Sequence, residues 1–179
     1  LEDSKSESYV EVKNMVFFKD KEAIELTDEE TKGVNFLRNK IKNATLTIEC
    51  DGGYFTIETL ESKMKLKSKL NIDQLNVNGN VGAEIVYYGC KDNLDNAGVL
   101  KSISKKAEKE IESYITKAFN KSKKYNYDFL GLGNYIYKNN YKYFDFENKD
   151  WNKDGLNKLN LKYNIDVSLY KQGNLRGDL

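Results

Sequence analysis

The hydrophobic positions of this chain follow two different periods, and the first is the period of β-strands. Between residues 70 and 88 the apolar side chains stand mainly at odd positions: Leu75, Val77, Val81, Ala83, Ile85 and Tyr87. Residues 44–50 alternate in the same way, and the turn at residues 51–53 leads into a long extended segment through Met64 and Leu66. Such alternation is typical of strands with one buried face. Because the connections are short, we predict three consecutive antiparallel strands.

The second period is that of a helix. From about Asp95 the apolar residues recur every three or four positions: Val99, Leu100, Ile103, Ala107, Ile111, Tyr114, Ile115, Ala118 and Phe119. This spacing predicts one amphipathic helix from about residue 96 to 122, roughly 40 Å long at 1.5 Å per residue. Later, the residues from Leu159 to Leu169 alternate between apolar and polar without a break, which predicts a last strand with one wet face.

Strands, then helices, then one more strand predict an α+β fold. In this fold an antiparallel β-sheet packs against the one long amphipathic helix, with shorter helices beside it. We expect the apolar stripe Val99–Phe119 to be covered by a sheet whose last strand is Leu159–Leu169. A parallel crossover at that strand would exclude this architecture.

The start of the chain has the pattern of a hairpin and a short helix. We expect residues 1–8 to be a disordered segment or linker, followed by a single domain at residues 9–179. Strand patterns at residues 9–18 and 23–26 flank a polar turn. Thr27 and Glu30 form a capping box, which predicts a helix that ends near Asn43.

Composition argues against several classes of function. The chain has 29 basic and 28 acidic residues, a net charge of +1, so it lacks the overall field that draws proteins onto nucleic acid. It has no histidine, the commonest catalytic base and a common zinc ligand. We therefore expect no enzyme activity, no cofactor and no nucleic-acid partner. No apolar run approaches the ~20 residues that span a bilayer, and the start at Leu1 leads us to expect a piece of a longer protein.

Cys50 and Cys90 are the only cysteines, too few for a four-cysteine metal site. We favour buried or half-buried free thiols. The alternative is a single disulfide, which an extracytoplasmic location would permit.

Three charged or glycine-rich motifs have simple structural explanations. Residues 128–133 (DFLGLG) lack the third glycine of a dinucleotide fingerprint and follow a helix, so we expect a tight turn between two helices. Residues 150–155 match the first half of a calcium loop, but Leu161 stands where the bidentate acid belongs, so we expect a polar turn. The lysines of the long helix indicate a solvated face, with contact to anionic lipid headgroups or an acidic partner as the alternative.

An aromatic cluster follows the glycine turn and provides the one candidate site. Most of it is expected to be core and rim, but so many tyrosines in a short span also favour a protein interface. The residues that we single out for this interface are Tyr135, Tyr141, Tyr143, Phe144 and Trp151. No residue is a candidate for catalysis, cofactor binding or metal binding.

Four blocks of sequence, in order, resemble the C-terminal domain of the Ger(x)C family of spore germination lipoproteins. They are residues 30–50, with a short helix before a strand that ends in Cys50; the long helix running into residues 128–133; Lys149-Asp150-Trp151; and an alternating strand closing with Gly173. The family's Arg/Lys-x-Pro-x-x-Trp pattern is absent, since residues 138–144 contain neither proline nor tryptophan. This difference indicates a distant member.

The resemblance implies both a fold and a role. The fold is a curved antiparallel sheet wrapped against one long helix, and a parallel crossover would exclude the family as well. The role is that of a non-catalytic C subunit of a nutrient germinant receptor, beside an A subunit and an integral membrane B subunit. A lipid anchor outside this segment would hold the subunit at the outer face of the spore inner membrane. The alternative role is an extracytoplasmic domain that binds the germinant itself.

Overall fold

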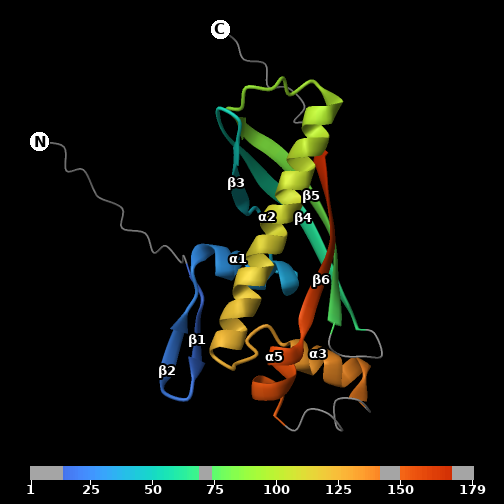
Figure 1. Cartoon of the computed structure of the whole chain (residues 1–179). Helices are drawn as coiled ribbons and strands as arrows, with labels where there is room; N and C mark the ends of the chain where they lie inside the picture. The colour runs from blue at the N-terminus through green and yellow to red at the C-terminus, as the bar shows by residue number, and fades with distance from the viewer. Residues whose placement is uncertain (1–13, 69–73, 142–149, 171–179) are drawn as a thin grey trace, which may run out of the picture.

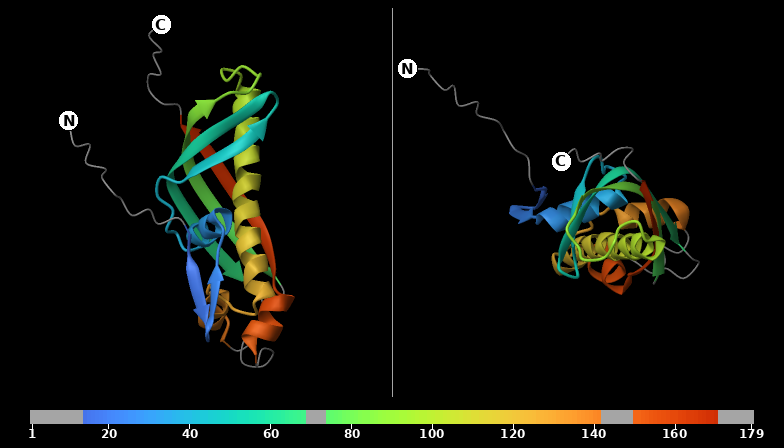
Figure 2. Two further views of the ribbon diagram at one scale, coloured as in Figure 1. Left: turned by 90° about the vertical axis from the view of Figure 1, so that its left-hand side faces the viewer. Right: turned by 90° about the horizontal axis from the view of Figure 1, so that it is seen from above.

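The computed structural model describes residues 14–68, 74–141 and 150–170, and it confirms an α+β fold. A four-stranded sheet curves around one long helix that lies along it (Figures 1 and 2). The strands are β3 (Thr45–Cys50), β4 (Gly53–Ser68), β5 (Gln74–Tyr88) and β6 (Asn160–Tyr170), and the helix is α2 (Ala97–Lys124). The predicted linker at residues 1–8 lies outside the described residues.

The smaller elements lie beside the second half of α2 and around its C-terminal end (Figure 1). A hairpin of β1 (Val16–Lys19) and β2 (Glu22–Glu25) leads into α1 (Asp28–Leu37). After α2 come α3 (Leu132–Asn139), a π-helical turn at Trp151–Gly155 and the single turn α5 (Leu156–Lys158). Figure 1 places α3 and α5 below the end of α2, close to the start of β6.

The first three strands of the sheet are antiparallel, as the short connections predict. Their inward residues form the core against α2, and Leu46, Phe55, Ile57, Leu75 and Val77 are fully buried. Register shifts near Ile57 and Glu61 of β4 mark bulges in the pairing with β5. A bulge adds twist to a strand, which fits the curvature of the sheet around the helix.

The direction of the last strand differs from the prediction. β6 lies beside β5 in parallel register, from Gln74 opposite Asn160 to Glu84 opposite Tyr170. The expectation of a wholly antiparallel sheet was therefore wrong. Short connections force antiparallel pairing, but the chain between Tyr88 and Asn160 runs through α2 and α3 and is long enough for a crossover. Alternation along β6 reveals which face is buried and carries no information about direction.

Helix α2 presents the predicted stripe to the sheet. Ile103, Ala107, Ile111, Ile115 and Ala118 are buried along it. The helix begins at Asn96, whose side chain accepts a hydrogen bond from the Gly98 amide. Covering of the stripe by a sheet that includes β6 is thus confirmed, although the strand runs the other way.

Helix α1 has the predicted capping box between Thr27 and Glu30. It ends at Leu37, earlier than expected. Gly33 faces the α2 backbone so closely that a methyl group there would overlap the Tyr114 carbonyl oxygen. Glycine is therefore required for the two helices to pack at this distance.

The lower half of β4 extends beyond its neighbour β3, and two side chains cover the exposed edge. The Asn39 amide forms hydrogen bonds with both backbone groups of Met64, at 2.6 and 3.0 Å. The Tyr135 hydroxyl donates to the Leu66 carbonyl oxygen at 2.6 Å. Unpaired strand edges invite pairing with other chains, so these contacts close an edge that would otherwise be open.

Candidate interaction surface

The glycine turn before α3 is organised by one carboxylate. Asp128 accepts hydrogen bonds from the backbone amides of Leu132 at 3.0 Å and Gly133 at 2.6 Å. Gly131 adopts a left-handed conformation with φ of 76°, which glycine tolerates without strain. The predicted turn between two helices is confirmed, and Asp128 satisfies amides that open α3.

Trp151 joins the same cluster from a distant part of the chain. Its indole Nε1 donates to the second oxygen of Asp128 at 2.9 Å. A side chain on Gly133 would overlap this indole ring, so the glycine lets the tryptophan lie against the start of α3. Trp151 is only partly exposed. In the structure Trp151 braces α3 through this hydrogen bond, and its predicted place in a protein interface stays a prediction.

The other acidic motif is also structural. The Asp150 carboxylate accepts from the Lys153 backbone amide, and the side-chain oxygen Oδ1 of Asn152 accepts from the Asp128 backbone amide. Leu161 lies within β6, as predicted. Within the described residues, no group of three or more acidic residues or cysteines is placed to hold a metal ion.

The predicted interface residues separate into three groups. Tyr135 is partly buried and covers the β4 edge, and Trp151 braces the turn. Tyr141 is 54% exposed, which suits a contact surface. Tyr143 and Phe144 lie outside the described residues.

Tyr137 completes the surface around Tyr141. It is 47% exposed, and its ring meets that of Tyr141 edge to face, with centroids 5.2 Å apart. Tyr137 lies in the last turns of α3, and Tyr141 follows the residue that ends the helix, Asn140, so the ring contact joins the helix end to the segment just after it. We call Tyr137 and Tyr141 the α3 tyrosine pair.

Sequence reasoning missed two features here. Asp128 stands three residues before Gly131, the N-cap of α3, and therefore outside the N-cap position at which capping carboxylates are usual, so no local signal marked it. Tyr137 belongs to the aromatic cluster, but only the structure shows that it shares an exposed face with Tyr141.

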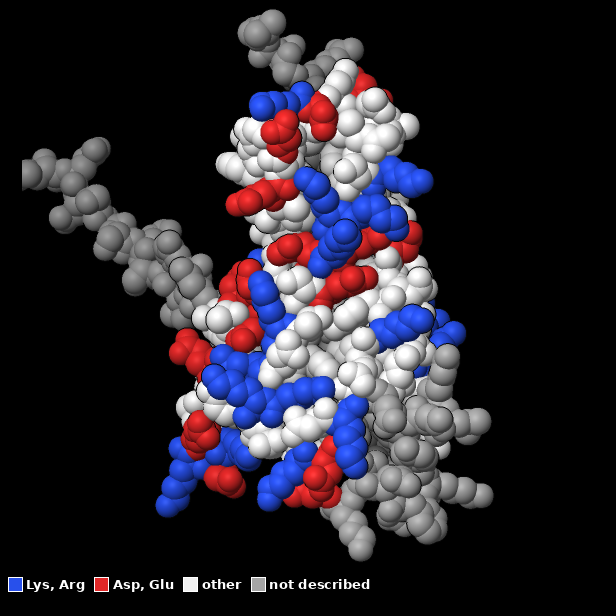
Figure 3. All heavy atoms as spheres, viewed as in Figure 1, with Lys and Arg blue, Asp and Glu red and all other residues white. Residues whose placement is uncertain are grey.

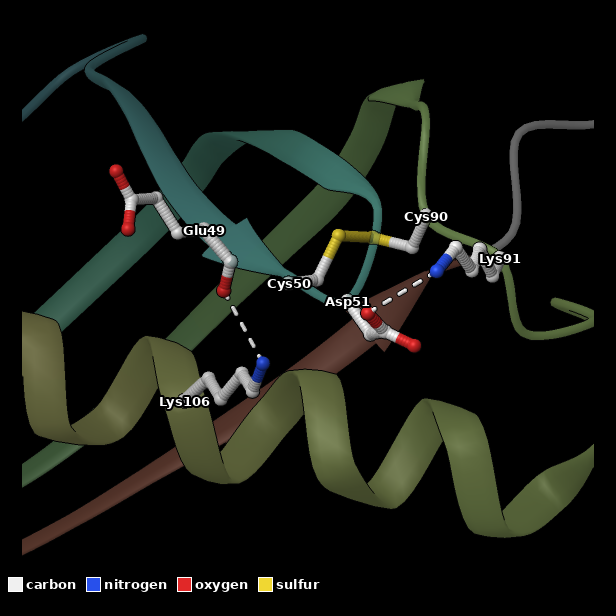
Figure 4. Close-up of a disulfide and its surroundings, with 6 residues drawn as sticks. All are labelled: Glu49, Cys50, Asp51, Cys90, Lys91 and Lys106. Carbon is white, nitrogen blue, oxygen red and sulfur yellow. Dashed lines mark hydrogen bonds and ion pairs between the residues drawn. A yellow bond between two sulfur atoms is a disulfide. The ribbon is translucent and has the colours of Figure 1, made fainter.

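The cysteines form a disulfide, so the preference for free thiols was wrong. Cys50 ends β3, and Cys90 follows β5 with its Cα 5.7 Å from that of Cys50 (Figure 4). The bond ties two strands that both pair with β4 but not with each other. Nearby, Lys106 of α2 donates to the Glu49 carbonyl oxygen at 3.1 Å, which links this end of the sheet to the helix. Periodicity could not reveal that Cys50 and Cys90 end up together.

Most lysines of α2 are engaged by the protein itself. Lys117 and Lys121 form ion pairs with Glu29 and Glu30 of α1. Lys123 donates to the Leu159 carbonyl oxygen at 2.7 Å, and Lys105 pairs with Glu108 at 2.6 Å. Figure 3 shows basic and acidic side chains interleaved over this face. The arrangement supports a solvated face tied to its neighbours, and contact of this face with anionic lipid headgroups or an acidic partner stays a prediction.

These features define a class, an α+β domain with a braced aromatic surface. Comparison with known protein families assigns the chain to a narrower group. The family described as "Spore germination B3/ GerAC like, C-terminal" matches residues 13–173, and the chain belongs to this Ger(x)C family. The parallel β6 therefore does not exclude the family, contrary to the expectation from sequence.

A solved structure supports the fold. The crystal structure of the GerBC protein is similar to this chain with a TM-score of 0.69 and 17% sequence identity, over 83% of this chain. The match covers 48% of the GerBC chain, so the present chain spans about half the length of that relative. No curated protein matches this chain. Among the described helices, none is both long enough and apolar enough to cross a membrane.

Proposed function

We propose that this chain is a non-catalytic domain of the C subunit of a spore germinant receptor, and that it serves receptor assembly or signalling. Family membership supports the receptor context. In this proposal the partners are the A subunit and the membrane-embedded B subunit. The whole subunit is lipid-anchored at the outer face of the spore inner membrane. The Cys50–Cys90 disulfide supports an extracytoplasmic location, because disulfides persist mainly in oxidising compartments.

The observation that supports a role in receptor assembly, through docking of this domain on the rest of the receptor, is the α3 tyrosine pair. We call this the docking role. Tyrosine is enriched at protein interfaces because its ring supplies apolar area and its hydroxyl a hydrogen bond. Tyr137 sits on α3, whose start is held by Asp128 and Trp151, and Tyr141 packs against it just past the helix end. A contact surface on a fixed support loses less conformational freedom when a partner binds. We therefore place the contact with the rest of the receptor at Tyr137 and Tyr141.

The test is a receptor carrying both Tyr137→Asp and Tyr141→Asp. Loss of interface hot-spot side chains costs about 2 kcal/mol or more, so we expect less receptor in the spore inner membrane and slower germination. The matched control is Tyr54→Asp with Tyr87→Asp, an exposed stacked pair near the disulfide, at the other end of the sheet. If receptor level and germination are normal in the Tyr137/Tyr141 variant, the docking role is wrong.

A second candidate function is direct binding of a small molecule, and one observation favours it. A groove of about 710 Å³ crosses the polar face of the sheet, within the size range of ligand sites. Thermal shift with amino acids and sugars tests this candidate, since a ligand of the folded state raises its stability by mass action. A screen without any shift would argue against it and leave the docking role untouched.

A further inference from the structure

The β1–β2 hairpin has one face against the domain and one exposed apolar face. Cross-strand partners share a face, and exposure alternates along β1. Phe17 and Ile24 stand opposite each other and face the domain. Val16 and Phe18 face away from it and are 46% and 70% exposed, and Ala23 stands opposite Phe18. We call Val16, Phe18 and Ala23 the hairpin face.

The inner face fixes the hairpin to the domain. The Phe17 ring stacks on the Phe129 ring with centroids 4.8 Å apart, and the Arg38 guanidinium lies over Phe17. The Lys19 ammonium donates to the Tyr125 carbonyl oxygen at 2.9 Å. An isolated two-stranded hairpin is only marginally stable, so these contacts hold it in place. The hairpin face therefore rests on a fixed support and loses little conformational freedom when a partner binds.

The hairpin stands out from the body of the domain at the place where the chain enters it. Seen from above, it projects from the side of the sheet and the long helix, beyond α1 (Figure 2). β1 is the first described strand and begins at Val16. Any polypeptide that precedes this chain would therefore be joined to the hairpin face through residues 1–15 alone.

The hairpin face is small for contact with a free partner. A phenylalanine side chain buries at most about 250 Å², and valine and alanine bury less, so the face falls well short of the ~800 Å² per partner of a standard interface. A tether removes this limit, because a linked partner binds at an effective concentration that reaches the millimolar range. The size of the face thus favours a partner on the same polypeptide over a free subunit or a second copy.

The charges around the hairpin face argue against a lipid partner. The turn and β2 contain three exposed acids, Asp20, Glu22 and Glu25, and one exposed base, Lys21. Segments that insert apolar side chains into anionic membranes are rich in lysine and arginine. Anionic headgroups would repel this acidic surrounding, so a protein surface fits the face better.

We propose that the hairpin face is the docking site for the upstream half of the same subunit. The family is described as a C-terminal one, and this chain covers 48% of the GerBC chain. The rest of a subunit of that size would precede this domain. That half packs an apolar surface against Phe18 and Val16, and the contact sets the orientation of the C-terminal domain within the subunit. The inference goes beyond the docking role at the α3 tyrosine pair, because it concerns a contact within one chain.

Site-specific photo-crosslinking in the full-length subunit, within the assembled receptor, tests this inference. A photoreactive phenylalanine derivative replaces Phe18, and mass spectrometry locates the crosslinked residue. We expect that residue to lie upstream of this domain in the same chain. The matched control places the same group at Leu60 on β4, which is 47% exposed. From position 60, the crosslink to the upstream half should be lost.

A second variant measures the contribution of the apolar contact. Val16→Asp should lower the yield of the intrachain crosslink from position 18 about tenfold, because burial of an unpaired charge disfavours the docked state. Leu60→Asp, an equal change at another exposed site, should leave that yield unchanged. Both replaced side chains are exposed, so circular dichroism should show the same fold. The crosslink from position 18 in the otherwise unchanged chain does not depend on either variant.

Each outcome decides for or against the inference. An intrachain crosslink from position 18 to the upstream half, weakened by Val16→Asp, supports it. Crosslinks to a second copy, to another receptor subunit or to lipid would overturn it by identifying a different occupant. No crosslink at position 18, or equal yields from positions 18 and 60, would overturn it as well. None of these results bears on the α3 tyrosine pair.

Discussion

At the scale of single residues, the Asp128 side chain holds together the start of α3. Its carboxylate holds two amides of α3 and the indole of Trp151, so three donors depend on one side chain. The sequence drew attention to the glycines around it, because they resemble a known fingerprint. The carboxylate matters more, and its partner lies 23 residues away in the chain. Local motifs cannot show such a contact.

This predicts a graded loss of stability at Asp128. Asp128→Ala should lower the free energy of unfolding by about 2–4 kcal/mol, since it leaves buried or half-buried donors unpaired. Asp128→Asn should cost less, because an amide keeps one acceptor oxygen. Urea unfolding followed by Trp151 fluorescence measures both. The control is Asp154→Ala, an exposed acid in the same region, and an equal effect at both positions would contradict the capping role.

Glu112 on α2 provides a test of pH dependence. Burial, followed by repulsion from Glu108, raises the pKa of the Glu112 carboxyl above its ordinary value of 4.5. The folded protein therefore holds this proton more tightly than the unfolded chain, and stability associated with Glu112 is lost as pH rises through the raised pKa. Glu112→Gln should be more stable than the wild type at neutral pH. The gap should shrink as pH falls below 4.5, and urea midpoints that differ equally at both pH values would contradict this assignment.

At the scale of elements, the sequence predicted well where each helix and strand lies in the chain, but not how distant segments pair with one another. The long helix, the three antiparallel strands, the capping box and the last strand all appear close to their predicted places. Each is specified by a local period or motif. The direction of β6 and the pairing of Cys50 with Cys90 depend on how distant segments meet. Neither is written in a local pattern, and both predictions were wrong.

The disulfide leads to a prediction at this scale. It closes a sequence separation of 40 residues between the end of β3 and the segment after β5. Replacing Cys50 and Cys90 by serine should lower the free energy of unfolding by about 2–4 kcal/mol, mainly by freeing the unfolded chain. The β3–β4 and β4–β5 pairings should keep the fold intact. Urea unfolding with and without reductant measures the cost, and a wild type insensitive to reduction would contradict the prediction.

At the scale of the whole molecule, the two faces of the sheet have different tasks. The inner face and α2 form the core, and the end with α1 and α3 is tied to it by Gly33, Asn39 and Tyr135. The outer face is left polar and carries a groove. The candidate docking surface was only partly predictable. The aromatic composition drew attention to this segment, but it could not show that Tyr135 and Trp151 form hydrogen bonds within the domain or that the Tyr137 ring meets Tyr141; the interface itself stays a prediction.

The most direct measurement is site-specific photo-crosslinking in the assembled receptor. A photoreactive phenylalanine derivative placed at position 141 should crosslink to another receptor subunit in the spore membrane, because we propose that the α3 tyrosine pair contacts it. The same group at position 87, which is also exposed, should not. A receptor that crosslinks equally at both positions, or only at position 87, would contradict the account.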